Sequence, residues 1–195
     1  MLISILVPAV PGRDSRRLLS SLYGQAAGQP VEVLVLCDNL KRSIGRKRND
    51  LLSVAQGDYI TFVDDDDIVT DDYVRSLVGS LGADVVTFDV EVTLNGGQAF
   101  PMRFSKDFTS ENRDGLWLRI PNHLMCVRRE LAVQNGFPDV GVGEDADYAK
   151  RLLPLLRSET RINRTLYFYR YSDAVTLTQT SRRSTCAHGH QRISP

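Results

Sequence analysis

The sequence predicts an α/β fold with a mostly parallel sheet that is covered by helices on both faces. Three observations predict it. Short apolar, β-branched runs alternate with segments of helical periodicity through the first half of the chain. One run, residues 31–36, is almost continuously apolar, as expected of a strand covered on both faces. A repeated strand–helix–strand order implies parallel strands joined by right-handed crossovers.

The first half of the chain contains three predicted strands, each followed by a predicted helix. The strands are rich in Val, Ile and Leu, whereas the helices carry apolar residues three and four positions apart. In chain order, these elements span residues 3–7, 14–25, 31–36, 46–55, 59–63 and 70–81. Ligands of a parallel sheet bind at the carboxyl ends of its strands. Asp38 follows the second strand and Asp64 follows the third, so both are expected at that edge.

The second half has a different pattern, with a hairpin followed by shorter elements. Asn95-Gly96-Gly97 is the expected turn of the hairpin, and Gly136 is expected to end a helix. The expected strands cover residues 84–94, 98–104, 123–127 and 161–171, and the expected helices cover residues 128–135 and begin again at residue 143. Residues 112–119, which include Trp117, have no regular pattern.

Composition indicates a globular protein without a bulk charge. Lys+Arg and Asp+Glu balance at 24 each, so net charge does not recruit nucleic acid or an anionic membrane. Three cysteines without metal-type spacing indicate reduced thiols in a cytosolic protein. No stretch is long enough to cross a bilayer, so we expect no transmembrane segment and a cytoplasmic location. We expect one domain over residues 1–180 and a basic, polar tail at residues 181–195.

Four consecutive aspartates, residues 64–67, follow the strand at residues 59–63 directly. Adjacent carboxylates repel one another, so this acidic tetrad opposes folding unless a positive group neutralises it. Mg²⁺ and Mn²⁺ prefer oxygen ligands, and Mg²⁺ is commonly held by one or two carboxylates together with substrate phosphates. The tetrad therefore indicates a divalent cation site. The alternative is a solvated acidic turn or the start of a helix, where carboxylates complement the helix dipole.

Residues 45–67 resemble the core signature of the family 2 glycosyltransferases. That signature consists of Arg-Asn, a helix, Ala-x-Gly-x-Tyr-Ile-x-Phe and an Asp-x-Asp motif. The matching residues here are Arg48-Asn49, Ala55-Gln56-Gly57-Asp58-Tyr59-Ile60-Thr61-Phe62 and Asp64-Asp65-Asp66. Further landmarks agree in order and spacing, at residues 3–8, 19–25, 31–38, 127–131, 136–138 and 143–145. The resemblance covers nearly all of the chain from residue 2 to about residue 175.

The resemblance implies a GT-A fold, which is a Rossmann-like three-layer sandwich. It also implies a nucleotide-sugar donor, with a UDP-sugar expected, a divalent metal (Mn²⁺ or Mg²⁺) and inversion at the anomeric carbon. Asp66 is the expected metal ligand, with Asp64 as a second candidate that lies nearer the ribose or sugar. Asp65 and Asp67 are expected to be spectators or caps. The implied donor-binding residues are Pro8, Asp38, Arg48, Asp64 and Asp65.

Inversion needs a base that deprotonates the acceptor hydroxyl, and Asp145 matches the family's base position. Glu144 and Trp117 are the expected acceptor-side residues. Trp117 is a candidate because sugars pack on aromatic faces. Each residue has a structural alternative. Asp145 and Glu144 could cap a helix, Trp117 could pack in the core, and Arg48 could belong to a solvated helix face together with its basic neighbours.

Histidines and local departures from the signature leave parts of the site open. Some GT-A enzymes use a late histidine as a metal ligand, and His188 and His190 are the late candidates here. The alternative for both is a flexible tail, and His123 is expected to be a packed or surface residue. Cys37-Asp38-Asn39 and Ala9-Val10-Pro11 replace the Asp-Gly-Ser and aromatic-Asn sequences common in the family. These departures leave the base and the sugar of the donor undecided.

The lead hypothesis is a metal-dependent inverting glycosyltransferase whose acceptor is a glycan or a lipid-linked sugar. A hydroxymethylated base in phage DNA is a minority alternative for the acceptor, because such a base could be flipped out and modified. A haloacid-dehalogenase-like phosphatase also places an Asp-x-Asp pair after a strand, although normally after the first strand. A nucleotidyltransferase would need a glycine-rich loop, for which residues 9–13 are a poor match. A non-catalytic nucleotide-sugar-binding domain is the remaining alternative.

Overall fold

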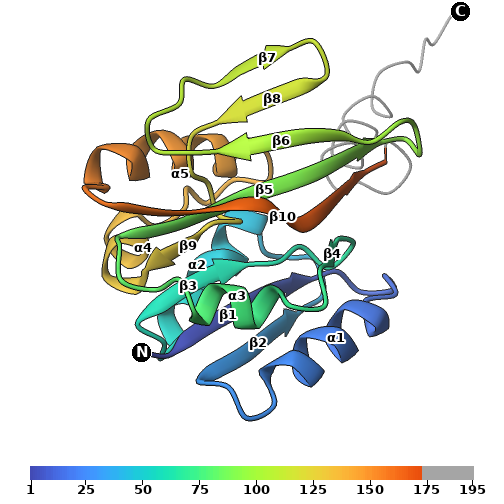
Figure 1. Ribbon diagram of the computed structural model, residues 1–195. Coiled ribbons are helices and arrows are strands. Elements are labelled where there is room, and N and C mark those ends of the chain that lie inside the picture. Colours follow the sequence, from blue (N-terminus) through green and yellow to red (C-terminus); the bar gives the residue numbers. More distant parts are fainter. Residues whose placement is uncertain (173–195) are drawn as a thin grey trace, which may run out of the picture.

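The computed structural model describes residues 1–172, which form a mixed α/β structure with one large sheet (Figure 1). Its strands are β1 (Ile3–Ala9), β2 (Val31–Cys37), β3 (Tyr59–Phe62), β4 (Ile68–Val69), β5 (Val85–Leu94), β6 (Phe100–Phe104), β7 (Glu111–Arg113), β8 (Leu116–Arg119), β9 (Cys126–Arg128) and β10 (Glu159–Tyr171). Its helices are α1 (Arg16–Ala26), α2 (Ile44–Val54), α3 (Tyr73–Val78), α4 (Arg129–Asn135) and α5 (Glu144–Leu152), followed by a 3₁₀ turn at Leu153–Leu155.

The first three strands form the parallel part of the sheet that the sequence predicts. Strand β1 lies between β2 and β3, so that Ile3 is beside Val31 on one side and Tyr59 on the other. All residues of β1 and β3 are buried. Strand β2 is the edge of the sheet, and its residues are only half-buried. Helices α1 and α2, which belong to the layers on the two faces, both contact it, as its apolar run predicts.

The second half extends the sheet with antiparallel strands. Strand β9 pairs with β3 and with β5, and β10 then runs parallel to β5. The expected hairpin is confirmed, with Val92 of β5 opposite Phe100 of β6 and with positive φ angles at Asn95 and Gly96. Because β9 lies between β3 and β5, the segment that leads into β9 passes close to the end of β3, where the acidic tetrad begins.

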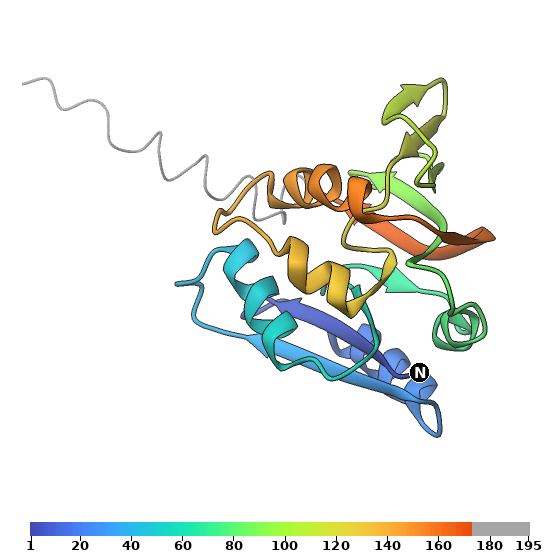
Figure 2. The same ribbon diagram turned by 90° about the vertical axis from the view of Figure 1, so that its left-hand side faces the viewer.

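Helices cover both faces of the sheet, as the sequence predicts (Figure 2). Helices α1 and α3 contact each other, and α2, α4 and α5 form a second group in mutual contact. The core between these layers is aromatic and aliphatic, and its largest fully buried side chains include Tyr59, Tyr73, Phe62 and Phe88. No helix within residues 1–172 is long and apolar enough to cross a membrane.

Several elements differ from the sequence-based expectation. Residues 112–119 are not irregular, because β7 and β8 form a small antiparallel hairpin around Gly115, whose φ angle is 68°. The helix expected over residues 70–81 is shorter, since α3 ends before Gly79 and β4 occupies part of the preceding segment. Helix α1 begins at Arg16 and not at residue 14, and the Asp14 carboxylate accepts hydrogen bonds from the backbone N–H and the side chain of Arg16. The tail at residues 181–195 lies outside the described residues.

Substitution of Gly57 tests the close packing between the loop before β3 and the first strand. A Cβ atom at this position would lie 2.5 Å from the backbone nitrogen of Ser4 and 2.6 Å from its Oγ, and both clashes involve buried atoms. Gly57→Ala should therefore destabilise the protein by about 1–3 kcal/mol, as overpacking does. The matched control is Gly24→Ala, because Gly24 lies in α1 and a Cβ added there would have nothing within 4 Å.

The control should be neutral or should stabilise the protein by up to about 1 kcal/mol, because alanine favours a helix over glycine. Urea denaturation measures both free energies of unfolding. Equal stabilities for the two variants would show that the loop can move away from Ser4, contrary to the packing described above.

Candidate active site

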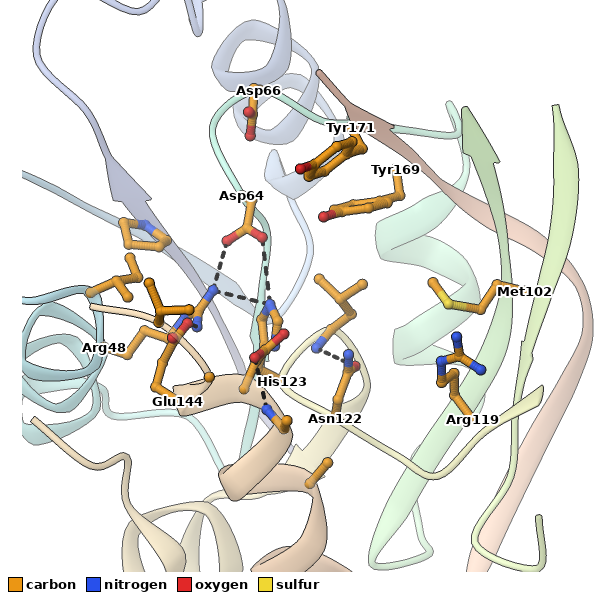
Figure 3. Close-up of a pocket in the computed structure, with 18 of the residues that line it drawn as sticks. Arg48, Asp64, Asp66, Met102, Arg119, Asn122, His123, Glu144, Tyr169 and Tyr171 are labelled. Atoms are coloured by element: carbon orange, nitrogen blue, oxygen red, sulfur yellow. Dashed lines mark hydrogen bonds and ion pairs between the residues drawn. The ribbon is translucent and has the colours of Figure 1, made fainter. Parts of the chain in front are cut away.

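A cavity of about 660 Å³ opens at the edge of the sheet where β1 and β3 end (Figure 3). Three groups of side chains line it. The first group comes from the ends of β1 and β3, the second from the start of α5, and the third from β6, β8 and β10. The residues of these groups that the argument uses are Pro8, Asp64, Asp65, Asp66, Glu144, Asp145, Trp117, Arg119, Tyr169 and Tyr171. The cavity thus brings together most of the predicted site residues within the described part of the chain.

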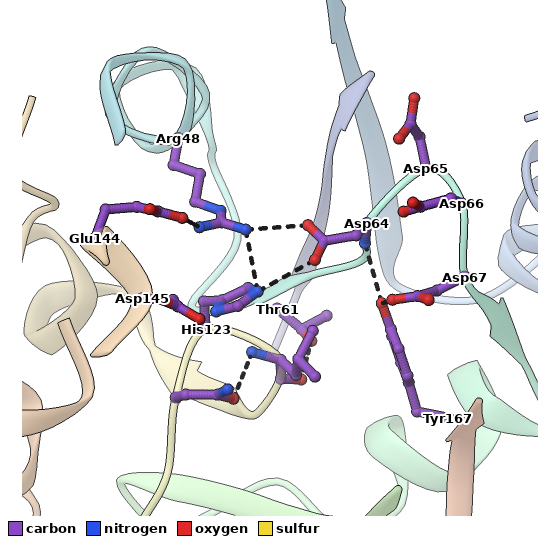
Figure 4. Close-up of polar contacts among 12 residues, drawn as sticks. Arg48, Thr61, Asp64, Asp65, Asp66, Asp67, His123, Glu144, Asp145 and Tyr167 are labelled. Atoms are coloured by element: carbon purple, nitrogen blue, oxygen red, sulfur yellow. Dashed lines mark hydrogen bonds and ion pairs between the residues drawn. The ribbon is translucent and has the colours of Figure 1, made fainter. Parts of the chain in front are cut away.

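The acidic tetrad forms a turn. An extended continuation of β3 would point Asp64 and Asp66 the same way, but the chain does not take that course here. The backbone N–H of Asp67 donates to the carbonyl of Asp64 at 3.1 Å. This turn gives each of the four carboxylates its own surroundings (Figure 4). The tetrad is therefore neither a solvated acidic loop nor a helix start, since Asp65 is only 2% and Asp67 only 3% exposed.

Two of the four carboxylates hold the turn in place. Asp65 accepts hydrogen bonds from the backbone N–H of Val10 at 2.6 Å and from Arg13 at 2.5 Å. Asp67 accepts from the hydroxyl of Tyr167 at 2.7 Å and from the backbone N–H of Arg170 at 2.8 Å. Burial, reinforced by the charge of Asp64, raises the pKa of Asp67 well above its usual value. Asp65 and Asp67 thus tie the tetrad to the loop after β1 and to β10, which gives them more structural importance than spectators.

Arg48 is the central cation of the site. Its side chain, only 4% exposed, donates to Asp64 Oδ1 at 3.0 Å and to Glu144 Oε1 at 2.5 Å. The rings of Phe62 and Phe137 lie 5.8 and 5.4 Å from its guanidinium carbon. Burial works against the ionisation of Asp64, but the charge and hydrogen bond of Arg48, together with the nearby His123, outweigh it and hold the pKa of this carboxyl well below its usual value. Arg48 therefore does not belong to a solvated helix face.

His123 joins this network, which the sequence did not predict. Its ring is 5% exposed, and its Nε2 lies 3.1 Å from the Arg48 guanidinium and 3.5 Å from Asp64 Oδ2. An arginine can only donate, so the shorter contact makes Nε2 the acceptor and places the proton of a neutral ring on Nδ1. That Nδ1 is buried and has no hydrogen-bond partner within residues 1–172. The sequence held no signal for this position, because it depends on the insertion of β9 between β3 and β5.

Asp38 lies at the end of β2 but does not line the cavity. Lys47, which is also buried, contacts Asp38 Oδ1 at 3.0 Å and donates to the carbonyl of Ala9 at 2.8 Å. Burial opposes ionisation of Asp38, yet the hydrogen bonds from Lys47 and from the Leu40 N–H lower its pKa. Binding of a nucleobase by Asp38 stays a prediction. Pro8, in contrast, lines the cavity as expected of a donor-side residue.

The two carboxylates at the start of α5 differ in their surroundings. Glu144 is buried and paired with Arg48, whereas Asp145 is half-buried and lines the cavity. The N-cap of this helix is Gly143, and no side chain caps it. Asp145 Oδ1 accepts a hydrogen bond from its neighbour Ala146 at 2.8 Å. This arrangement keeps Glu144 in a structural ion pair and presents Asp145 to the cavity.

The far wall of the cavity is aromatic. Trp117 packs edge-on against Phe100, with ring centroids 4.8 Å apart, and the guanidinium carbon of Arg119 lies 4.8 Å from the Trp117 ring. Trp117 therefore both packs and lines the cavity, so its two sequence-based interpretations are compatible. Tyr169 and Tyr171 of β10 line the upper part of the same space (Figure 3). The predicted late ligands His188 and His190 lie outside the described residues.

Asp66 is the carboxylate best placed to contact a metal ion. It borders the cavity and has one ion pair, at 3.2 Å to Arg13, within residues 1–172. Burial, opposed by Arg13, raises its pKa, so a nearby divalent cation would compensate a charge that the protein itself compensates only in part. Within the same residues, no three His, Cys, Asp or Glu side chains form a complete metal site. A metal ion at this place would therefore need ligands beyond the protein's own side chains, and Asp66 and Asp64 as metal ligands stay predictions.

Comparisons with known proteins agree with this architecture. Residues 15–131 match the family model described as glycosyl transferase family 2. No curated protein sequence matches the chain. Among solved structures, S. aureus TarS 1-349 in complex with UDP-GlcNAc is similar, with a TM-score of 0.66, 14% identity and coverage of 91% of this chain and 61% of that chain.

Two further structures show the same fold. S. aureus TarS 1-349 in complex with UDP has a TM-score of 0.59 and 15% identity over 89% of this chain and 61% of that chain. S. aureus TarS itself has a TM-score of 0.61 and 17% identity, with 89% of this chain covering 37% of that chain. This chain therefore spans about three fifths of the TarS 1-349 structures, and the likeness concerns the fold.

Replacement of Arg48 tests its central place in the site. Arg48→Met leaves Asp64 and Glu144 without their shared cation, and loss of one partner of a buried ion pair typically costs about 3–5 kcal/mol. The control is Arg46→Met on the same helix, because Arg46 is 60% exposed and pairs with Asp50 at the surface. That variant should lose at most about 1 kcal/mol. Urea denaturation without ligands measures both, and a small loss in Arg48→Met would contradict a central role.

Proposed function

The chain belongs to glycosyl transferase family 2, and we propose that it transfers a sugar from a nucleotide-diphosphate donor to an acceptor hydroxyl with inversion. The observation that carries the proposal is the pairing in one cavity of two carboxylates with different tasks. Asp66 borders the cavity on the side of the tetrad, and Asp145 borders it from α5. Arg48 holds the neighbouring carboxylates, Asp64 and Glu144, and so fixes the two sides relative to each other.

The reaction requires that one bond forms while another breaks. The oxygen of the acceptor hydroxyl bonds to the anomeric carbon of the sugar, and the bond from that carbon to the diphosphate oxygen breaks on the opposite face. Asp145 takes the hydroxyl proton as the attack proceeds, which makes the oxygen a better nucleophile. The nucleoside diphosphate leaves with the bonding electron pair, so negative charge grows on the side of Asp66.

A divalent cation would be held by Asp66 and by the oxygens of the diphosphate, with Mn²⁺ and Mg²⁺ as the candidates. Such an ion stabilises the negative charge of the leaving group when it is bound. The protein's own contribution on this side is to hold Asp66 at the cavity, because Asp65 and Asp67 anchor the turn to the loop after β1 and to β10. Arg13, which contacts both Asp65 and Asp66, adds positive charge near the same place.

A UDP-sugar is the proposed donor, and a glycan or glycolipid is the proposed acceptor. The TarS structures with UDP and with UDP-GlcNAc support a uridine nucleotide as the first candidate to test. A hydroxymethylated base in DNA remains the second candidate for the acceptor. The phosphatase alternative loses support, because Asp65, the first aspartate of its loosely matching Asp-x-Asp pair, is buried and accepts hydrogen bonds from Val10 and Arg13. Family membership also favours sugar transfer.

Metal dependence can be tested by nucleotide binding. UDP or UDP-GlcNAc together with Mn²⁺ should raise the melting temperature of the protein, because binding to the folded state stabilises it by mass action. The nucleotide without Mn²⁺, or Mn²⁺ without the nucleotide, should raise it less. Asp66→Asn should lose the additional effect of Mn²⁺. Thermal-shift measurements with ADP and GDP in parallel test which nucleobase the protein prefers. An equal shift with UDP in the presence and in the absence of a chelator would argue against a shared metal site.

Substitution of the proposed base separates chemistry from binding. Asp145→Asn should lower sugar transfer by about 100-fold or more while leaving UDP affinity within about twofold, since general base catalysis typically contributes about 10²–10⁴-fold. Asp147→Asn is the control, because Asp147 lies on the same helix in an exposed ion pair with Arg151. Transfer and UDP titrations measure the two effects. Full turnover in Asp145→Asn would assign the base elsewhere.

A further inference from the structure

Arg119 is a cavity-lining cation that pairs with neutral groups. Its guanidinium donates to the carbonyls of Glu111 and Leu118, at 3.0 and 2.7 Å, and to the amide oxygen of Asn112 at 2.6 Å. Within residues 1–172, it forms no ion pair with a carboxylate. Three of its N–H groups are used in this way, and an arginine has five. The hydrogen bonds therefore fix the side chain without neutralising its charge.

Two of the other arginines on the cavity wall, Arg48 and Arg13, behave differently. Arg48 and Arg13 each contact two carboxylates. The negative charges of Asp64 and Glu144 raise the pKa of Arg48, although burial opposes this shift. The pKa of Arg119, in contrast, is lowered by burial, with no carboxylate to offset it. Lys150 of α5 also borders the cavity, and its side chain has no ion pair or hydrogen bond within residues 1–172. Arg119 and Lys150 thus face the cavity without a carboxylate partner in the described residues, and so does Arg170, which lies beside the tetrad because its backbone N–H donates to Asp67.

Arg119 and Lys150 lie away from the carboxylate that would hold the diphosphate. Figure 3 shows Arg119 across the cavity from Arg48 and Asp64, on the wall that also carries Met102. Lys150 lies on the same helix as Asp145, beyond the proposed base. The charges of Arg119 and Lys150 therefore belong to the half of the cavity that an acceptor would enter. The donor diphosphate would have other partners, namely Arg13, Arg170 and a cation held by Asp66.

We propose that Arg119 and Lys150 form an oxyanion-binding subsite for the acceptor, so that the acceptor is a sugar bearing a phosphate or a carboxylate. This inference rests on the proposed sugar transfer and names the substrate class of that reaction. Arginine binds both oxyanions through paired hydrogen bonds. The Trp117 ring lies next to this subsite, with its centroid 4.8 Å from the Arg119 guanidinium carbon, and offers an apolar surface for the carbon skeleton of the acceptor.

The subsite can be tested by isothermal titration with small probes that differ in charge. Methyl α-D-glucopyranoside, glucose 6-phosphate and glucuronate are titrated into the full chain at low salt, with and without UDP and Mn²⁺. The anionic sugars should bind about tenfold or more tightly than the neutral one, because charge-assisted hydrogen bonds are the strong ones. Their binding should persist with UDP and Mn²⁺ present. Equal affinities for all three, or displacement by UDP, would overturn the proposal.

Variants assign the effect to the proposed residues. Arg119→Gln and Lys150→Gln should each reduce the preference for the anionic sugars, and Arg119→Lys should keep part of it. Lys150→Gln serves as the second test if loss of the Arg119 hydrogen bonds disturbs β7. The control is Arg113→Gln on β7, because Arg113 is 65% exposed and paired with Glu111. An unchanged preference in both Arg119→Gln and Lys150→Gln would overturn the proposal.

Two further results separate this inference from the function on which it rests. Absence of any UDP binding would count against the proposed donor site, while the preference for anionic sugars would still be measured in the free protein. Oligothymidylate serves as the nucleic-acid probe. Binding of oligothymidylate through Arg119, without binding of glucose 6-phosphate, would replace the anionic sugar by DNA as the acceptor class and overturn the proposal.

Discussion

One buried guanidinium, that of Arg48, holds the candidate active site together. It contacts Asp64 at the end of β3 and Glu144 at the start of α5, and it packs between Phe62 and Phe137. A buried arginine without partners would be strongly unfavourable, as would the buried Glu144 and the partly buried Asp64 without a cation. The three groups therefore stabilise one another only when α2, β3 and α5 are in their observed arrangement. The same arrangement places Asp66 and Asp145 on the cavity.

The acidic tetrad is tolerated because its charges are separated by the turn. Asp64 is paired with Arg48, Asp65 with Arg13, and Asp67 accepts hydrogen bonds from β10. Only Asp66 borders the cavity with a weaker pairing, at 3.2 Å. Four adjacent carboxylates thus yield one that is suited to a cation, and the other three build the support that keeps it there. The proposed acceptor wall has the opposite charge, through Arg119 and Lys150.

Much of the fold could be predicted from the sequence because local patterns determine it. Strand–helix alternation in the first half, and the glycine turn at residues 95–97, follow directly from periodicity and turn chemistry. The edge position of β2, the β7–β8 hairpin and β4 could not be predicted, because they depend on pairing between distant segments. The same limit applies to the site. Asp66 and Asp145 could be proposed from motifs, whereas the contact of His123 with Arg48 depends on how β9 inserts into the sheet.

The central claim is that Arg48 couples the donor side of the cavity to the helix that carries the proposed base. A double-mutant cycle with Arg48→Met and Glu144→Gln tests it most directly, with the free energy of unfolding measured in urea. Residues in one ion-pair network typically show interaction energies of about 0.5–3 kcal/mol. The 2.5 Å contact between Arg48 and Glu144 predicts a value above about 1 kcal/mol. Additivity of the two single losses within about 0.5 kcal/mol would contradict the claim.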